Sequence, residues 1–224
     1  MKFSIITLFP EVFDPILNSS ILKRAQKKRL VEFELVNLRN FGEGRHQVVD
    51  DRPYGGGAGM VLKADILSKA LVSIKKYDRV ILTSASGKQY KQKMAQKLSK
   101  INHIVIVCGH YEGVDQRFIE KYVDEEISIG DYVLTGGEVP AMVIIDSVTR
   151  LIPKVLAKPE ATVNESFSEK LLEHPQYTRP EEFEDSKVPE VLLSGNHGEV
   201  DKWRAEMSLK KTKKIRPDLI TQKD

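Results

Sequence analysis

Residues 103–109 read HIVIVCG, an unbroken apolar run that ends in a glycine. Residues 79–84, RVILTS, have the same texture. Runs without polar alternation indicate strands that are buried on both faces of a parallel sheet, because helices cover both faces of such a sheet. We therefore expect these two segments to form the centre of an α/β fold.

Further strands and helices flank this centre in alternating order. Apolar runs or period-two alternation predict additional strands at residues 3–9, 31–38 and 125–135. Helix-like segments lie between and after them, at residues 64–76, 89–100, 115–123 and 139–152. This alternation predicts a mostly parallel sheet with helices on both of its faces.

The composition is that of a soluble globular protein, with 41% hydrophobic and 30% charged residues in 224 positions. This length suits one sizeable core, or one domain with a small appendage. The single cysteine, Cys108, excludes an intramolecular disulfide framework and favours a reducing compartment, so we expect a cytoplasmic protein. Because Pro10 and Glu11 interrupt the apolar N-terminal stretch, we expect neither a signal peptide nor a membrane span.

Positive charge is concentrated in two stretches, although the net charge is only +3. Residues 63–100 carry ten Lys or Arg against two Asp or Glu, and residues 202–224 carry eight against three. Such stretches suit the binding of phosphate groups, but solvated lysine-rich helix faces produce the same pattern.

The chain changes in texture after Pro153, where proline-punctuated turns replace the strand and helix alternation. A helix is predicted near residues 197–213, and Asn196 with Glu199 three residues later resembles a capping box at its start. Val200, Trp203 and Met207 share one face of that helix, which is most simply a small helical core.

Three of the predicted strands end in glycine-containing loops, at residues 85–88, 109–113 and 135–138. Ligands of open parallel sheets bind beyond the carboxyl ends of the strands, and glycines allow the backbone to approach a ligand closely. Glycines that serve only tight turns are the alternative for any one loop. The occurrence of all three favours a binding site.

Residues 54–60, YGGGAGM, form a fourth glycine-rich stretch within a segment, 39–59, that has no periodic pattern. A Walker loop fails because Gln89 follows Gly87-Lys88, and a dinucleotide fingerprint fails because Met60 stands where glycine is required. We therefore expect a ligand held by backbone groups and apolar walls rather than a polyphosphate. The segment itself is either a mobile loop over a polar substrate or an exposed connector.

Six motifs lie in one order along almost the whole chain. They are DDRPYGGGAGMV (50–61), CGHYEGVDQR (108–117), SIGDYVLTGGEVPAM (128–142), ESF (165–167), YTRP (177–180) and LLSGNH (192–197). Together they resemble the bacterial tRNA (guanine-N1)-methyltransferase family, the TrmD enzymes.

The resemblance implies a SPOUT-type fold, an α/β parallel sheet flanked by helices with a deep C-terminal trefoil knot. General topology rules would not predict a knot. It further implies a methyltransferase domain over residues 1–157 with the S-adenosylmethionine site in the knot, a linker over 158–170, and a small helical tRNA-binding domain over 171–224. The implied assembly is a homodimer with the active site at the subunit interface.

The resemblance also implies the reaction, methyl transfer from S-adenosylmethionine to N1 of the guanosine immediately 3′ of the anticodon (position 37) in tRNA. By motif position, Glu165 is the general base that accepts the N1 proton, and Arg150 stabilises negative charge that develops on O6. Family members commonly have Asp at the position of Glu165. The extra methylene lengthens the reach by one C–C bond and adds rotamer freedom.

The implied cofactor-binding residues belong to the three strand-end loops: Ala85, Gly109, Tyr111, Glu112, Gly113, Ile129, Gly130, Tyr132, Leu134, Gly136 and Gly137. His110 stands where many relatives have Arg, and Ala85-Ser86 replaces a Pro-Gln pair. We interpret His110 as a loop residue rather than a proton carrier, because N1 chemistry already has its base.

The implied substrate-binding residues are Asp50, Gly55, Gly59, Tyr177, Arg179, Ser194, Asn196 and His197. The target base must leave its stack before N1 is accessible, and these residues are expected to contact the RNA there. Loop capping explains Asp50 and Ser194 equally well. The family is associated with Mg²⁺ dependence, but this sequence displays no dedicated metal site.

Two other functions are compatible with part of this pattern. One is a SPOUT methyltransferase that acts on another RNA atom, such as a ribose 2′-OH; the ESF and SGNH elements favour the guanine-N1 family instead. The other is a non-catalytic RNA-binding dimer, against which the presence of Arg150 and Glu165 argues.

Overall fold

The computed structural model describes residues 1–158, 162, 165–168 and 170–221. The chain folds into two compact units, Met1–Ala157 and Lys158–Asp224. Parts of the predicted linker and of the predicted C-terminal domain lie outside the described residues, namely 159–161, 163–164, 169 and 222–224.

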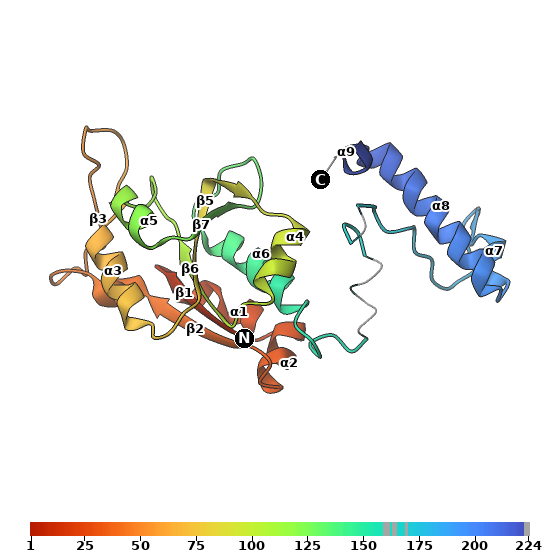
Figure 1. Cartoon of the computed structure of the whole chain (residues 1–224), viewed down its shortest axis with the longest axis horizontal. Helices are drawn as coiled ribbons and strands as arrows, with labels where there is room; N and C mark the ends of the chain where they lie inside the picture. Colours follow the sequence, from red (N-terminus) through yellow and green to blue (C-terminus); the bar gives the residue numbers. More distant parts are fainter. Residues whose placement is uncertain (159–161, 163–164, 169, 222–224) are drawn as a thin grey trace. The chain divides into compact units, whose positions relative to one another are not determined.

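The first unit is built on a five-stranded sheet with the strand order β2-β1-β6-β5-β7 (Figure 1). Its strands are β1 (Lys2–Thr7), β2 (Glu32–Asn37), β5 (Arg79–Gln89), β6 (His103–Cys108) and β7 (Glu125–Ser128). Every neighbouring pair is parallel, which confirms the predicted parallel sheet. Strand β6, which contains the apolar run HIVIVC, is central in the sheet and buried at every residue.

Helices cover both faces of this sheet. They are α1 (Asp14–Leu17), α2 (Ser20–Lys27), α3 (Ala64–Ser73), α4 (Gln92–Leu98), α5 (Gln116–Tyr122) and α6 (Glu138–Thr149), with short 3-10 helices η1 (Pro10–Val12) and η2 (Leu38–Phe41). Side chains of α2, α4 and α6 share one core with Ile104 and Ile106 of β6. Those of α3 and α5 share the other core with Val105 and Val107, so alternate residues of β6 serve opposite faces.

The structure corrects two of the strand predictions. The strand expected over 125–135 ends at Ser128, whose hydroxyl donates to the carbonyl oxygen of Gly130 (2.9 Å) and so turns the chain into a loop. Strand β5 continues beyond Ser84 to Gln89, with an irregular register between Thr83 and Lys88. Residues 85–88 are therefore an irregularity inside a long strand rather than a strand-to-helix loop. Helices α1 and α2 were not predicted.

The glycine-rich stretch joins two short antiparallel strands, β3 (Asp50–Asp51) and β4 (Val61–Leu62). The base of this hairpin is hydrogen-bonded to the loop that follows β6. Glu112 N donates to Met60 O (3.0 Å), Leu62 N to Gly113 O (2.9 Å) and Asp115 N to Leu62 O (3.0 Å). The glycine loop is therefore anchored at its base to the loop that follows β6.

The second unit contains β8 (Glu182–Phe183), β9 (Ser186–Lys187), α7 (Glu190–Leu193), α8 (His197–Ile215) and α9 (Asp218–Thr221). The predicted helix is α8, and Asn196 Oδ1 accepts from Glu199 N (3.3 Å) at its start, as one half of the predicted capping box. Val200 is buried, and the ring of Trp203 lies against Tyr177 (6.2 Å between centroids). None of the helices within the described residues is both long and apolar enough to cross a membrane.

Candidate functional site

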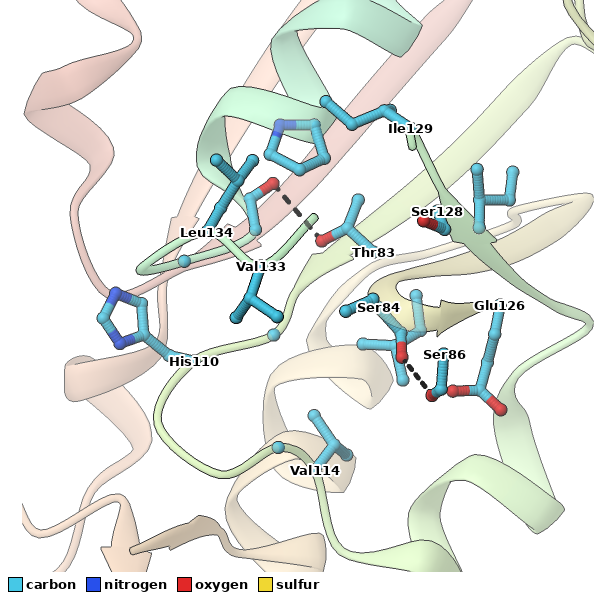
Figure 2. A pocket seen from close by; sticks show the side chains of 18 of the residues that line it. Thr83, Ser84, Ser86, His110, Val114, Glu126, Ser128, Ile129, Val133 and Leu134 are labelled. Carbon is cyan, nitrogen blue, oxygen red and sulfur yellow. Dashed lines mark hydrogen bonds between the residues drawn. The ribbon is translucent and has the colours of Figure 1, made fainter. Parts of the chain in front are cut away.

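A pocket of about 510 Å³ opens at the carboxyl ends of β5, β6 and β7 (Figure 2). Three segments that are far apart in the sequence line it, within residues 82–86, 109–119 and 126–140. This is where open parallel sheets bind ligands, and the volume is in the range of small-molecule sites.

All eleven residues that the sequence predicts for the cofactor line this one pocket: Ala85, Gly109, Tyr111, Glu112, Gly113, Ile129, Gly130, Tyr132, Leu134, Gly136 and Gly137. The structure therefore brings the irregular part of β5 together with the loops that follow β6 and β7, at the edge of the sheet where the sequence predicted a site. The pocket alone does not name its ligand, so the cofactor role of these residues stays a prediction.

Close backbone packing explains why glycine is needed where the loops meet. Gly137 N donates to Gly109 O (2.8 Å), and a Cβ at Gly137 would lie only 2.7 Å from Gly109 N. The hydroxyl of Thr83 donates to Gly137 O (3.3 Å) and to Val107 O (3.2 Å). These contacts join β5, β6 and the loop before α6 into one pocket wall.

The charge of the pocket lining is acidic. Among the described residues that form it, Glu112 and Glu126 are the carboxylates, and neither Lys nor Arg is present. Neither carboxylate has a hydrogen-bond or ion-pair partner within the described part of the chain. An acidic lining without a cation disfavours a polyphosphate, in agreement with the failed phosphate-loop patterns.

The sequence reasoning did not single out Glu126. It lies on β7 opposite Leu82 of β5, within a run that reads simply as a strand. The sequence did contain a signal for this residue, the acidic pair Glu125-Glu126 at the start of an otherwise apolar strand. Successive side chains of a strand point to opposite faces, so the two carboxylates should face different surroundings.

A third carboxylate, that of Glu138, lies behind the pocket lining. Glu138, the first residue of α6, is only 6% exposed, and its Oε1 accepts from the hydroxyl of Thr7 (2.8 Å). His110 Nε2 lies 4.0 Å from Glu138 Oε2. Figure 2 shows the His110 ring turned away from Thr83, and the interpretation of His110 as a loop residue stays a prediction. Burial and the charge of Glu138 raise the pKa of the Cys108 thiol well above its ordinary value.

The glycine hairpin borders this pocket through Gly59. A Cβ at Gly59 would lie 2.5 Å from Glu112 Cγ and 2.7 Å from Glu112 Cδ, whereas the space around Gly55 is open. Asp50 lies in β3, paired with Leu62. The sequence suggested that these glycines serve the RNA more than the cofactor, but Gly59 packs directly against a residue of the pocket wall.

Of the two predicted catalytic residues, Arg150 belongs to the same unit as the pocket but does not line it. Arg150 caps the carboxyl end of α6, whose amino end lies at the pocket. A helix of 12 residues spans about 18 Å, so the first unit by itself holds Arg150 away from the pocket. Glu165 belongs to the second unit, where its carbonyl oxygen accepts from Ser168 N (3.1 Å). Asn164, which precedes it in the motif, lies outside the described residues.

The remaining predicted RNA contacts also belong to the second unit: Tyr177, Arg179, Ser194, Asn196 and His197. Tyr177 is 49% exposed. Ser194 Oγ donates to Val191 O (2.8 Å) and accepts from Asn196 N (3.2 Å), so Ser194 has a capping role of its own. The contacts of these residues with RNA stay predictions.

The described residues contain no group of three or more His, Cys, Asp or Glu side chains that could hold a metal ion. The fold and the pocket define a class, α/β proteins with a pocket of small-molecule size at the carboxyl edge of a parallel sheet, here with an acidic lining.

Comparison with known proteins narrows this class to one family. The chain belongs to the family described as tRNA (Guanine-1)-methyltransferase TrmD, whose family model matches residues 1–222. This confirms the resemblance that the six motifs carry.

Three relatives named tRNA (guanine-N(1)-)-methyltransferase illustrate the similarity. The chain is 53% identical to that of Bacillus pumilus over 98% of its own length and 92% of the relative's. The corresponding values are 54%, 98% and 90% for Dictyoglomus turgidum, and 50%, 98% and 92% for Bacillus subtilis. The likeness therefore spans both units.

Proposed function

We propose that this protein is an enzyme that transfers a methyl group from S-adenosylmethionine to N1 of the guanosine immediately 3′ of the anticodon (position 37) in tRNA. Family membership and the names of the relatives support the tRNA substrate and the N1 atom. The observation that carries the choice of donor is the pocket, where eleven residues predicted for that cofactor meet around one cavity.

The pocket fits S-adenosylmethionine chemically. Ile129 and Leu134 supply apolar walls, and the closely packed backbone at Gly109 and Gly137 offers polar groups without side-chain bulk. The acidic lining complements a ligand that carries a positive sulfur and an ammonium group. The chemistry that the bound cofactor supplies is an electrophilic methyl group on that sulfur.

The residues of this chain then have two tasks at the guanine. Glu165 accepts the proton of N1, so that the N1 lone pair is available for the new N–C bond. Arg150 stabilises the negative charge that develops on O6. The proposal includes Mg²⁺ dependence as a property of the family, and it assigns no ligands to the ion. It also includes the cytoplasm as the compartment, because the chain has a single cysteine.

The position of Arg150 supports an active site between two subunits. Val139 (53% exposed), Val143 (41%), Asp146 and Arg150 recur at helical spacing on one face of α6. If two copies of α6 pack antiparallel through this face, a two-fold axis passes through the middle of the face. The pairs 139/150 and 143/146 share that midpoint, so Val139 of one copy lies against Arg150 of the other. Each pocket then receives its arginine from the other subunit, and the homodimer completes the site.

The knot and the division into domains complete the proposal. The deep trefoil knot lies in the C-terminal part of the domain over residues 1–157, where Gly137 N donates to Gly109 O (2.8 Å) and loops from β6 and β7 are held together. Residues 158–170 are the linker. Residues 171–224 form a small helical tRNA-binding domain, which the many basic residues of α8 support.

One assay tests the reaction. The protein is incubated with methyl-labelled S-adenosylmethionine and with tRNA transcripts that have or lack a guanosine after the anticodon, and the labelled nucleoside is mapped. We expect N1-methylguanosine at that position only in transcripts that carry the guanosine. Label on a ribose would select the second methyltransferase function, and no transfer would favour a binding protein.

The general base is tested by Glu165→Gln, which keeps the size of the side chain but cannot accept the proton. We expect the turnover number to fall by about 100-fold or more, with the dissociation constant for S-adenosylmethionine unchanged. Unchanged turnover would remove Glu165 from this role.

A further inference from the structure

Glu126 stands out among the residues that line the pocket. Its side chain is partly buried near the start of β7, and Figure 2 shows it on the side of Ser84 and Ser86, opposite Val133 and Leu134. The two serine hydroxyls hydrogen-bond to each other (2.9 Å) rather than to this carboxylate. Glu126 is therefore a charge that faces the ligand space without a partner in the described chain.

The rest of the lining does not compensate this charge. Glu112 adds a second carboxylate, and neither Lys nor Arg lines the pocket. Glu138, just behind the loop at Gly136, is a third carboxylate within the same region. The nearby Arg117 is bonded to Asp115 through two contacts (2.6 and 3.0 Å) and is itself outside the lining. A partly buried, uncompensated carboxylate favours a cation beside it.

The proposed reaction changes the charge of the ligand. When the methyl group leaves, the positive sulfonium becomes a neutral thioether, while the adenosine, the ammonium and the carboxylate of the ligand are unchanged. We infer, on the basis of the proposed function, that Glu126 is a specificity residue that favours the positively charged methyl donor over its neutral thioether product. The pocket then binds the donor more tightly relative to the product, and product release becomes easier.

The measurement is a set of dissociation constants from calorimetry for three ligands. They are S-adenosylmethionine, its thioether product S-adenosylhomocysteine, and sinefungin, in which a protonated amine replaces the sulfonium methyl group. In Glu126→Gln, we expect the affinities for the two charged ligands to fall about tenfold more than the affinity for the thioether, as expected for a charge pair in a partly solvated pocket. Glu126→Asp, which keeps the charge, should restore most of the selectivity.

Glu125→Gln is the matched control. Glu125 is the neighbouring residue on β7, is similarly partly buried and does not line the pocket. Its loss should leave all three dissociation constants within twofold of wild type. Glu125→Gln removes the same charge from the same strand. If it changed the ratio of charged-ligand to thioether affinity as much as Glu126→Gln does, the selectivity would come from the overall electrostatic field of the protein, and the role of Glu126 would be overturned.

Two further outcomes would overturn the inference. Equal losses for all three ligands in Glu126→Gln would mean that Glu126 binds a part they share, and no change would mean that it does not sense the ligand. The proposed function fails in a different way. If wild-type protein binds none of the three ligands, the pocket is not a site for this cofactor, whatever the variants do.

Discussion

Replacing Gly59 by alanine should change the shape of the pocket at the carboxyl edge of the sheet, although Gly59 is not part of its lining. An added Cβ would lie 2.5 Å from Glu112 Cγ and 2.7 Å from Glu112 Cδ. Carbon atoms in contact settle about 3.5–4.0 Å apart, so the Glu112 side chain must move by about 1 Å. A shift of about 1 Å near a reacting centre costs up to about 100-fold in rate, and we expect about tenfold in cofactor affinity because Glu112 is only one part of the wall.

Backbone strain must be separated from this contact. Gly59 has φ of +82°, where alanine costs about 1–2 kcal/mol. Gly56 has φ of +81° in the same loop, and no atom lies within 4 Å of the position of its Cβ. Gly56→Ala therefore carries the same strain without the collision, and it is the matched control.

The assay measures the dissociation constant for S-adenosylmethionine by calorimetry and the melting temperature of both variants. We expect similar melting temperatures, a tenfold weaker cofactor affinity in Gly59→Ala, and nearly wild-type affinity in Gly56→Ala. Equal cofactor affinities in the two variants would refute the reasoning. If Gly59→Ala binds S-adenosylmethionine normally but binds tRNA more weakly, the glycine loop serves tRNA binding alone.

Two further predictions concern stability. Thr7→Val removes the hydroxyl that donates to buried Glu138 (2.8 Å), and a hydrogen bond to a charged group contributes about 1.5–3 kcal/mol to stability. We therefore expect the melting temperature to fall by about 3–10 °C in Thr7→Val, whereas Thr7→Ser, which keeps the hydroxyl, should melt close to wild type. Equal melting temperatures of the two variants in calorimetry would contradict this. The hydroxyl of Ser4 and the ammonium of Lys2 lower the pKa of Glu34 below its ordinary 4.5, so its stabilisation is present above that pH and is lost as the pH falls through the folded-state pKa. Denaturant unfolding of Glu34→Gln should show a deficit in the free energy of unfolding near neutral pH that shrinks as the pH falls below 4.5, and a deficit of constant size over that range would count against it.

Apolar patterning predicted the centre of the fold because burial there is complete. Strand β6 has no exposed residue, and its neighbours in the sheet pair with it in parallel register. The same patterning misled over residues 129–135, where Tyr132, Val133 and Leu134 continue the apolar texture but are exposed in a loop. Apolar residues in that loop form the wall of a pocket, and periodicity does not distinguish a pocket wall from a strand.

The candidate site was predictable where glycines follow strands and not where it depends on single side chains. Gly109, Gly136 and Gly137 have motif neighbours and packing constraints that make them visible in the sequence. Glu126 has neither, and its role depends on which face of β7 it occupies. The distance between Arg150 and the pocket follows from the length of α6, since the two lie at opposite ends of this helix. The sequence alone does not show that the amino end of α6 lies at the pocket, so it could not indicate that the arginine comes from a second subunit.

The glycine hairpin offers a site for a fluorescent label, because its tip is exposed while its base is hydrogen-bonded to the pocket loop. Tyr54 at the tip is 99% exposed, whereas Met60 and Leu62 at the base are hydrogen-bonded to the pocket loop. The native thiol, Cys108, is buried, so a cysteine introduced at position 54 can be labelled selectively with a fluorophore. Because the base of the hairpin is hydrogen-bonded to the pocket loop, we expect the fluorescence anisotropy of such a label to change when a ligand occupies the pocket, without any need for turnover.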